Sequence, residues 1–94
     1  MDTKLISIGL GNVANACKIV AIVAPGSAPA KRLVQDARDN SPAALVDATA
    51  GRRCRSVLVM DSCQVVLSSL LPETIARRVN GSIDDFGKDD DDEA

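Results

Sequence analysis

Val57-Leu58-Val59-Met60 and Val65-Val66-Leu67 are two short apolar runs, joined by the polar segment Asp61-Ser62-Cys63-Gln64. Runs rich in β-branched residues on either side of a tight connection predict a β-hairpin. We expect one strand over residues 55–61 and its antiparallel partner over residues 64–68. Because more strands than helices are expected in the whole chain, a central antiparallel hairpin favours the α+β class.

Three further strands are expected upstream of the hairpin, over residues 4–8, 17–23 and 44–47. The segment Gly9-Leu10-Gly11-Asn12 predicts a turn between the first two of them, with Gly9 and Gly11 in structural roles. The letters Gly9-x-Gly11-x-x-Ala14 match a dinucleotide-binding fingerprint. That motif requires a helix at this point, whereas residues 17–23 predict a strand, so a glycine turn is the better interpretation.

Two helices are expected. Ser27 is a candidate N-cap and Pro29 suits the first turn of a helix that ends near Arg38. The i, i+3, i+4, i+7 spacing predicts an inward face made of Ala30, Leu33, Val34 and Ala37. The second helix begins at Pro72, with Ile75 and Val79 inward and with Arg77 and Arg78 on or near the opposite side. The predicted fold is a small, twisted, mainly antiparallel sheet with one central helix and a short C-terminal helix.

Three arginines crowd into the segment Gly51-Arg52-Arg53-Cys54-Arg55, directly before the hairpin. Gly51 is expected to form the turn. Like charges at this density repel one another, and the planar fork of Arg fits phosphate oxygens. The segment is therefore either a solvated run of charge or a site for a polyanion. Further basic residues that could contribute are Lys18, Lys31 and Arg32, with Arg77 and Arg78 as a separate pair.

Charge divides the chain into a basic body and an acidic tail. The net charge is -2, but residues 84–94 hold seven acidic residues against Lys88 alone, which gives -6 there and leaves +4 for residues 1–83. We expect one domain over residues 1–81 and a disordered acidic tail over residues 82–94. The tail is either a solubilising segment or one that pairs with the basic body.

Composition argues against several function classes. The chain has no His, Tyr or Trp and no nucleophile with an evident base, so we expect neither an enzyme nor a small-molecule substrate, metal or other cofactor. The three cysteines, Cys17, Cys54 and Cys63, are interpreted as small buried hydrophobic residues of a reducing cytoplasm. We expect neither a signal peptide nor a membrane-spanning segment. A body with one Phe has a thin core, and oligomerisation commonly offsets that weakness.

Basic residues without stacking aromatics favour duplex DNA, held by its phosphates, over single-stranded RNA. We therefore expect double-stranded DNA and further copies of the same chain as partners. The alternative is a structural homo-oligomer that has lost DNA binding.

Four blocks in the same order carry a resemblance to a known family. They are residues 8–12 (IGLGN), 20–32 (VAIVAPGSAPAKR), 47–55 (DATAGRRCR) and 70–74 (LLPET). The chain resembles the bacterial RemA family of extracellular-matrix (biofilm) regulators over roughly residues 3–80. It differs from the usual residues of that family at Leu10, Lys18, Ala50 and Cys54.

The resemblance implies a nucleoid-associated transcriptional regulator that assembles into ring-like homo-oligomers and bends or wraps DNA. The family's DNA contacts would fall on Arg52 and Arg53, with Lys18 as a further basic contact. Its sensitive proline would fall on Pro29. From the residues themselves, Arg55, Lys31 and Arg32 are added to the candidate DNA-binding set.

Overall fold

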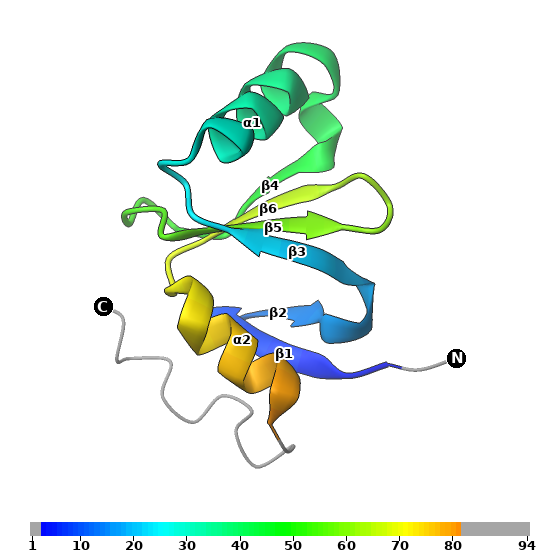
Figure 1. The fold of residues 1–94 in the computed structure, drawn as a ribbon, viewed down its shortest axis with the longest axis vertical. Coiled ribbons are helices and arrows are strands. Elements are labelled where there is room, and N and C mark those ends of the chain that lie inside the picture. The colour runs from blue at the N-terminus through cyan, green and yellow to red at the C-terminus, as the bar shows by residue number, and fades with distance from the viewer. Residues whose placement is uncertain (1–2, 82–94) are drawn as a thin grey trace.

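The computed structural model describes residues 3–81, and the predicted acidic tail at residues 82–94 lies outside the described residues. Six strands are present: β1 (Leu5–Gly9), β2 (Asn12–Asn15), β3 (Ile19–Val23), β4 (Leu45–Asp47), β5 (Ser56–Met60) and β6 (Val65–Ser68). The helices are α1 (Ala28–Asn40) and α2 (Pro72–Asn80), and two short 3-10 turns, η1 (Ala16–Lys18) and η2 (Pro42–Ala44), complete the fold (Figure 1). The predicted α+β class is confirmed.

The predicted central hairpin is confirmed. Strands β5 and β6 pair antiparallel, with Leu58 opposite Val66 and Val57 opposite Leu67. At its turn, the amide of Cys63 donates to the carbonyl of Met60 at 3.1 Å, and the amide of Met60 donates to the carbonyl of Gln64 at 2.9 Å. Cys63 has φ +70°, the left-handed conformation that closes a three-residue hairpin loop.

The strands form two sheets, whereas the sequence predicted one. A four-stranded sheet has the order β3-β5-β6-β4, and β1 and β2 form a separate two-stranded sheet. All pairs are antiparallel except β4 with β6. Strand β2 was missed because Asn12-Val13-Ala14-Asn15 lacks a run of β-branched residues. The expected strand over residues 17–23 begins only at Ile19, since Ala16–Lys18 form η1.

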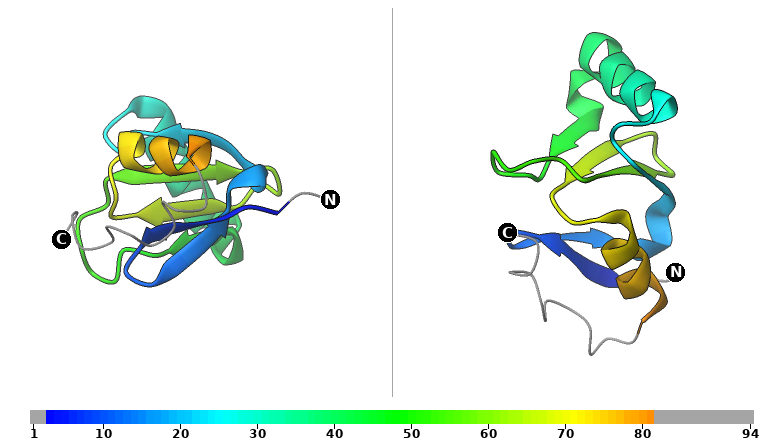
Figure 2. Two further views of the ribbon diagram at one scale, coloured as in Figure 1. Left: turned by 90° about the horizontal axis from the view of Figure 1, so that it is seen from below. Right: turned by 60° about the vertical axis from the view of Figure 1, so that its left-hand side comes forward.

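The large sheet is the middle layer of the molecule. Helix α1 lies on one side of it, and the β1–β2 hairpin with α2 lies on the other (Figures 1 and 2). Alternation along β5 sends Val57 into the core beneath α1 and Leu58 into the core shared with β1 and α2. Both side chains are at most 1% exposed. A strand buried on both faces explains why this part of the sequence is continuously apolar.

Helix α1 begins as predicted. The hydroxyl of Ser27 accepts from the amide of Ala30 at 3.3 Å, and Pro29 lies in the first turn. Ala30 and Ala37 are buried, but Leu33 is 36% exposed, so its inward assignment was wrong. The buried stripe is narrow because α1 packs through its two small residues, which leaves Leu33 at the flank.

Helix α2 differs from the prediction in the position of Arg78. Arg78 was expected on or near the outer side, but its side chain is 1% exposed and its Nη1 donates to the carbonyl of Ser7 at 3.1 Å. It follows Ile75 by three residues, which places both on one helical face. At the end of α2, the ammonium of Lys4 donates to the carbonyls of Val79 and Gly81, both at 2.6 Å. A cation at this position stabilises the negative end of the helix dipole.

The cysteines also differ from expectation, because Cys17 and Cys63 are exposed and Cys54 is half-buried. Cys17 and Cys63 occupy a 3-10 turn and a hairpin loop, where no neighbouring layer covers them. Burial raises the pKa of the Cys54 thiol, which holds it in the protonated form.

Candidate nucleic-acid interface

The arginine-rich segment forms the loop between β4 and β5, residues 48–55, which we call the basic loop. Both of its ends are tied to β6. The amide of Ala48 donates to the carbonyl of Leu67 at 2.9 Å, and the amide of Arg55 donates to the carbonyl of Ser68 at 2.8 Å. Because these two carbonyls belong to consecutive residues of a buried strand, the ends of the basic loop have a fixed separation.

A tight turn forms the tip of the basic loop. The amide of Arg52 donates to the carbonyl of Thr49 at 2.9 Å, and the two residues between them, Ala50 and Gly51, have φ +52° and +83°. Two consecutive left-handed residues define a type I′ turn. Gly51 adopts this conformation without strain, whereas Ala50 does so at a steric cost. The turn directs the chain into Arg52 and Arg53, which are both exposed.

Replacing Ala50 should stabilise the fold without altering its charge. Asn-Gly is a strongly preferred pair for a type I′ turn, because Asn tolerates the left-handed conformation. We expect Ala50→Asn to raise the free energy of unfolding by roughly 0.5–1 kcal/mol, given that a left-handed L-residue costs about 1–2 kcal/mol. Chemical denaturation measures this change. The control is Ala43→Asn, at an exposed position whose φ is negative; an equal gain there would show that the turn is not the cause.

Asp47 supports the start of the basic loop. Its Oδ1 accepts from the amide of Thr49 at 2.9 Å and from the Thr49 hydroxyl at 2.6 Å. These two hydrogen bonds, the hydroxyl one foremost, lower the pKa of the Asp47 carboxyl below its ordinary value of 3.8. Asp47 therefore forms an Asx-type turn that begins the basic loop.

The lowered pKa predicts a pH dependence of stability. Well above pH 3.8, Asp47 is ionised in both the folded and the unfolded chain, and its full contribution to stability is present. As pH falls, the unfolded chain takes up the proton first, so the contribution declines and disappears below the folded pKa. We expect Asp47→Asn to be less stable than the parent chain at pH 7 and equally stable at the acid limit. A constant difference between the two unfolding free energies across this range would contradict the assignment.

The glycine turn at residues 9–11 lies beside the start of the basic loop. The amide group of Asn12 donates to the carbonyl of Gly9 at 3.2 Å and to that of Ala48 at 3.4 Å. Gly9 has φ +102°, which favours glycine, and a Cβ there would make a tight contact of 3.2 Å with the Leu70 side chain. The turn thus joins the small sheet to the base of the loop.

The other candidate basic residues lie at different distances from the loop. Val23 pairs with Val57, so the end of β3 and the following start of α1, with Lys31 and Arg32 exposed, lie at the same end of the strands as the basic loop. In the right-hand view of Figure 2, the large sheet lies between the basic loop and the start of α1. Arg55 is half-buried at the foot of the loop.

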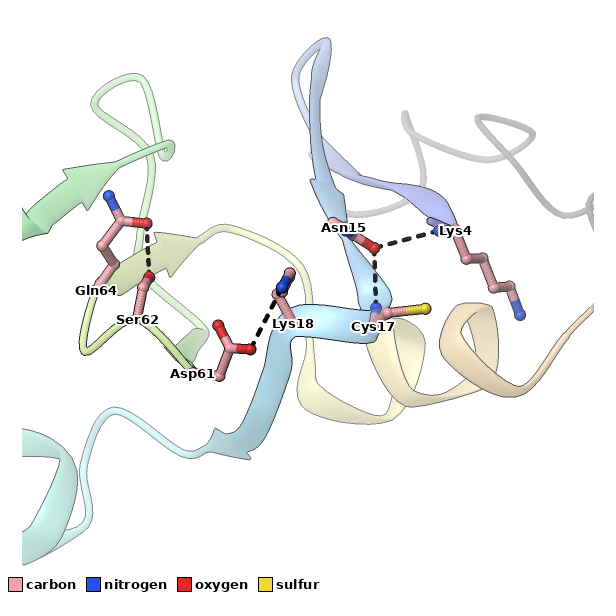
Figure 3. A network of polar contacts seen from close by, with 7 residues as sticks. All are labelled: Lys4, Asn15, Cys17, Lys18, Asp61, Ser62 and Gln64. Atoms are coloured by element: carbon pink, nitrogen blue, oxygen red, sulfur yellow. Dashed lines mark hydrogen bonds and ion pairs between the residues drawn. The ribbon is translucent and has the colours of Figure 1, made fainter. Parts of the chain in front are cut away.

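Lys18 lies at the opposite end of the sheet. Ile19 pairs with Met60, and the amide of Asp61 donates to the carbonyl of Lys18 at 2.8 Å. The ammonium of Lys18 also forms an ion pair with Asp61 at 3.7 Å (Figure 3). Within one chain, Lys18 is therefore separated from Arg52 and Arg53 by the length of a five-residue strand, about 16 Å.

The electrostatics of the basic loop differ from those of Lys18. Lys18 pairs with Asp61, whereas no carboxylate of residues 3–81 lies within ion-pair distance of Arg52 or Arg53. Two exposed guanidinium groups on a constrained turn remain available to an external anion. Sequence reasoning missed the anchors of this turn, Leu67 and Ser68, because backbone carbonyls leave no signal in side-chain patterns.

Residues 3–81 contain no group of three or more His, Cys, Asp or Glu side chains that could hold a metal ion. The same residues include no helix that is both long and apolar enough to cross a membrane.

The fold and the loop define a class, namely small α+β proteins that present exposed arginines on a constrained turn at one end of a layered sheet. The family model RemA-like, described as "Extracellular matrix regulatory protein A-like", matches residues 5–79. The chain belongs to this family, as its sequence blocks indicated.

Three relatives, each named as a putative regulatory protein, illustrate the similarity. The protein from Lachnoclostridium phytofermentans is 58% identical over 77 residues, which cover 82% of each chain. The protein from Geobacillus kaustophilus is 54% identical over 89 residues, which cover 95% of this chain and 99% of the relative. The protein from Clostridium beijerinckii is 52% identical over 93 residues, which cover 99% and 100%. The names of the family and of these relatives support a regulatory role.

Proposed function

We propose that this protein is a DNA-binding transcriptional regulator or architectural protein that contacts duplex phosphates through Arg52 and Arg53. One observation carries the proposal: both guanidinium groups are exposed on a turn whose ends are tied to β6, and neither pairs with a described carboxylate. A preorganised donor loses little conformational entropy when it binds, and Arg matches phosphate geometry in a bidentate way.

The chemistry of the loop favours duplex phosphates over unpaired bases. Proteins that hold single strands stack successive bases on aromatic side chains. The chain has no Trp or Tyr and a single Phe, Phe86. Without a stacking platform, affinity comes from phosphate neutralisation, which is strongly dependent on salt and weakly dependent on sequence. Arg55, Lys31 and Arg32 are proposed as flanking contacts, and Lys18 as a weaker one because Asp61 already pairs with it.

Self-association is part of the proposal. Strand β3 is an edge of the large sheet, and Val20 on it is 67% exposed. Beside it, an open groove of about 610 Å³ runs between β3 and α2, lined mainly by apolar side chains that include Ile22, Ala76 and Val79. We propose that a second copy of the chain covers this groove, because a body of this size gains needed burial by association. Repetition of such a contact would form a ring-like homo-oligomer that displays many basic loops.

The family's description extends the proposal to regulation of extracellular-matrix genes in a bacterial cytoplasm, with the protein associated with the nucleoid. A second candidate function is a homo-oligomer that serves as a scaffold and does not bind DNA. The exposed groove at β3 favours this second candidate, because it accounts for assembly without any role for the basic loop.

Two measurements on the full chain separate these functions. Fluorescence anisotropy of a labelled duplex at low salt tests DNA binding, with an unlabelled duplex of unrelated sequence and a single strand of equal length as competitors. We expect the duplex to compete well and the single strand poorly. Light scattering on the same samples tests assembly. A higher oligomer that leaves the duplex free would support the scaffold, and a monomer at micromolar concentration would contradict the proposed assembly.

A further inference from the structure

The acidic residues that follow α2 have the charge and the reach to occupy the basic loop. We propose that residues 89–93 of the same chain bind Arg52 and Arg53 and thereby compete with DNA, an inference that rests on the proposed function. The competing segment is Asp89-Asp90-Asp91-Asp92-Glu93, five carboxylates in succession. It offers the arginines the same class of ligand as a nucleic-acid backbone, namely a row of closely spaced anionic oxygens.

The attachment point of this segment is fixed. Lys4 on β1 donates to the carbonyls of Val79 and Gly81, both at 2.6 Å, so the chain leaves the fold from a held position at the end of α2. The nine residues of α2 make it about 14 Å long. Its first residue, Pro72, lies four residues after Ser68, whose carbonyl accepts from the amide of Arg55 at 2.8 Å. The tether and the basic loop therefore stand at opposite ends of one helix.

The number of residues between Gly81 and each carboxylate determines how far that carboxylate can reach toward the basic loop. The path from Gly81 along α2 to Ser68, which is hydrogen-bonded to Arg55, is roughly 27 Å, and Arg52 and Arg53 lie up to about 10 Å beyond Arg55, at roughly 3.3 Å per residue. Asp89 follows Gly81 by eight residues and Glu93 by twelve, which corresponds to about 26–40 Å of extended chain. Asp84 and Asp85 follow Gly81 by three and four residues, about 10–13 Å of extended chain, which is shorter than the length of α2 itself.

The receiving surface is available for this contact. Neither Arg52 nor Arg53 pairs with a carboxylate of residues 3–81, and both are exposed. The body carries +4 and the segment beyond it -6, so the two attract once they come within a Debye length, about 8–10 Å at physiological salt. Tethering gives the segment an effective concentration in the millimolar range, at which even a weak contact is populated. DNA must displace the segment before it reaches the arginines.

A matched pair of full-length variants tests the inference. Asp91→Asn with Asp92→Asn removes two charges within reach of the loop, and Asp84→Asn with Asp85→Asn removes two charges outside it. We expect the first pair to tighten duplex binding at low salt by roughly two- to tenfold, the gain that a competitor at millimolar effective concentration allows. The second pair should have little effect, and the gain should narrow as salt rises.

The position of the charges distinguishes docking from general repulsion. Long-range repulsion between the acidic segment and DNA depends on net charge, which changes equally in both variants. Equal gains in the two variants would therefore overturn the inference, and so would the absence of any gain in a chain that binds DNA.

A second readout requires no DNA. A labelled peptide of residues 82–94 is titrated into the full chain in which residues 89–93 are neutralised to Asn and Gln. We expect the peptide to bind at low salt and to lose binding when Arg52→Ala and Arg53→Ala are added. Peptide binding that survives those two changes, or that never occurs, would overturn the inference. If no variant binds DNA, the proposed function fails, while the peptide titration still decides whether the segment occupies the loop.

Discussion

Arg52→Ala combined with Arg53→Ala should weaken duplex binding by about a hundredfold or more at low salt. A hydrogen bond to a charged group contributes about 1.5–3 kcal/mol, and each 1.4 kcal/mol corresponds to a factor of about ten in affinity. Two such groups on one turn give about 3–6 kcal/mol for each bound chain. Anisotropy measures the loss. Arg55→Ala should cost less, because Arg55 is half-buried at the foot of the loop.

The fold should be unaffected by the double substitution, since both side chains are exposed and no described carboxylate pairs with them. Arg77→Ala is the matched control, because it removes one exposed arginine from α2 rather than from the loop. We expect this control to keep nearly the parent affinity. Circular dichroism should show equal thermal midpoints for the parent and the double variant. Retention of parent-like affinity by a folded double variant would remove Arg52 and Arg53 from the interface.

Leu58→Ala should destabilise the chain by about 3–5 kcal/mol, a large part of what a domain of this size has available. Leu58 is 0% exposed in the middle of the large sheet, opposite Ile22 on one side and Val66 on the other. Its side chain joins the large sheet to the β1–β2 hairpin and α2. The resulting cavity lies in the interior, where the neighbours relax only partly. Denaturant unfolding measures the difference.

Val20→Ala on the neighbouring strand is the control for this experiment. Val20 is 67% exposed, so its truncation should change the unfolding free energy by no more than about 0.5 kcal/mol in the isolated chain. If the two substitutions proved equally costly, the proposed layering of the sheet between α1 and the small hairpin would be wrong.

The parts of the fold that sequence could predict are those whose neighbours are close along the chain. Hairpin β5–β6 follows from two β-branched runs and a short polar turn, and α1 follows from Ser27, Pro29 and the spacing of its alanines. The turn at Gly9, Leu10 and Gly11, where all three φ values are positive, was predicted from its glycines, but strand β2 was not, because residues 12–15 lack a run of β-branched residues.

Burial of Arg78 shows a second limit of prediction from sequence. Spacing from Ile75 placed it on the inner face of α2, but a charged side chain is ordinarily assigned to solvent. Its hydrogen bond to the carbonyl of Ser7 comes from a strand 71 residues away in sequence. Such a partner cannot be inferred from composition or periodicity.

The candidate site also has a part that the sequence predicted and a part that it did not. The sequence predicted the cluster of Arg52, Arg53 and Arg55, because they are adjacent along the chain. It gave no indication that Lys18 lies at the far end of the sheet beside Asp61, since that follows from the antiparallel register of β3 and β5. Repeated basic loops in an assembly would extend the surface, but Lys18 within one chain belongs to a separate surface.

Salt dependence tests the central claim most directly. The association constant of the full chain for two duplexes of unrelated sequence is measured over a range of salt concentrations, with the Arg52→Ala, Arg53→Ala variant alongside. We expect linear plots of log affinity against log salt, similar for both duplexes, and a slope in the variant that is shallower by about one unit for each lost arginine per bound chain. Parallel slopes for the parent and the variant, or no retention of either duplex at low salt, would contradict binding through these two arginines.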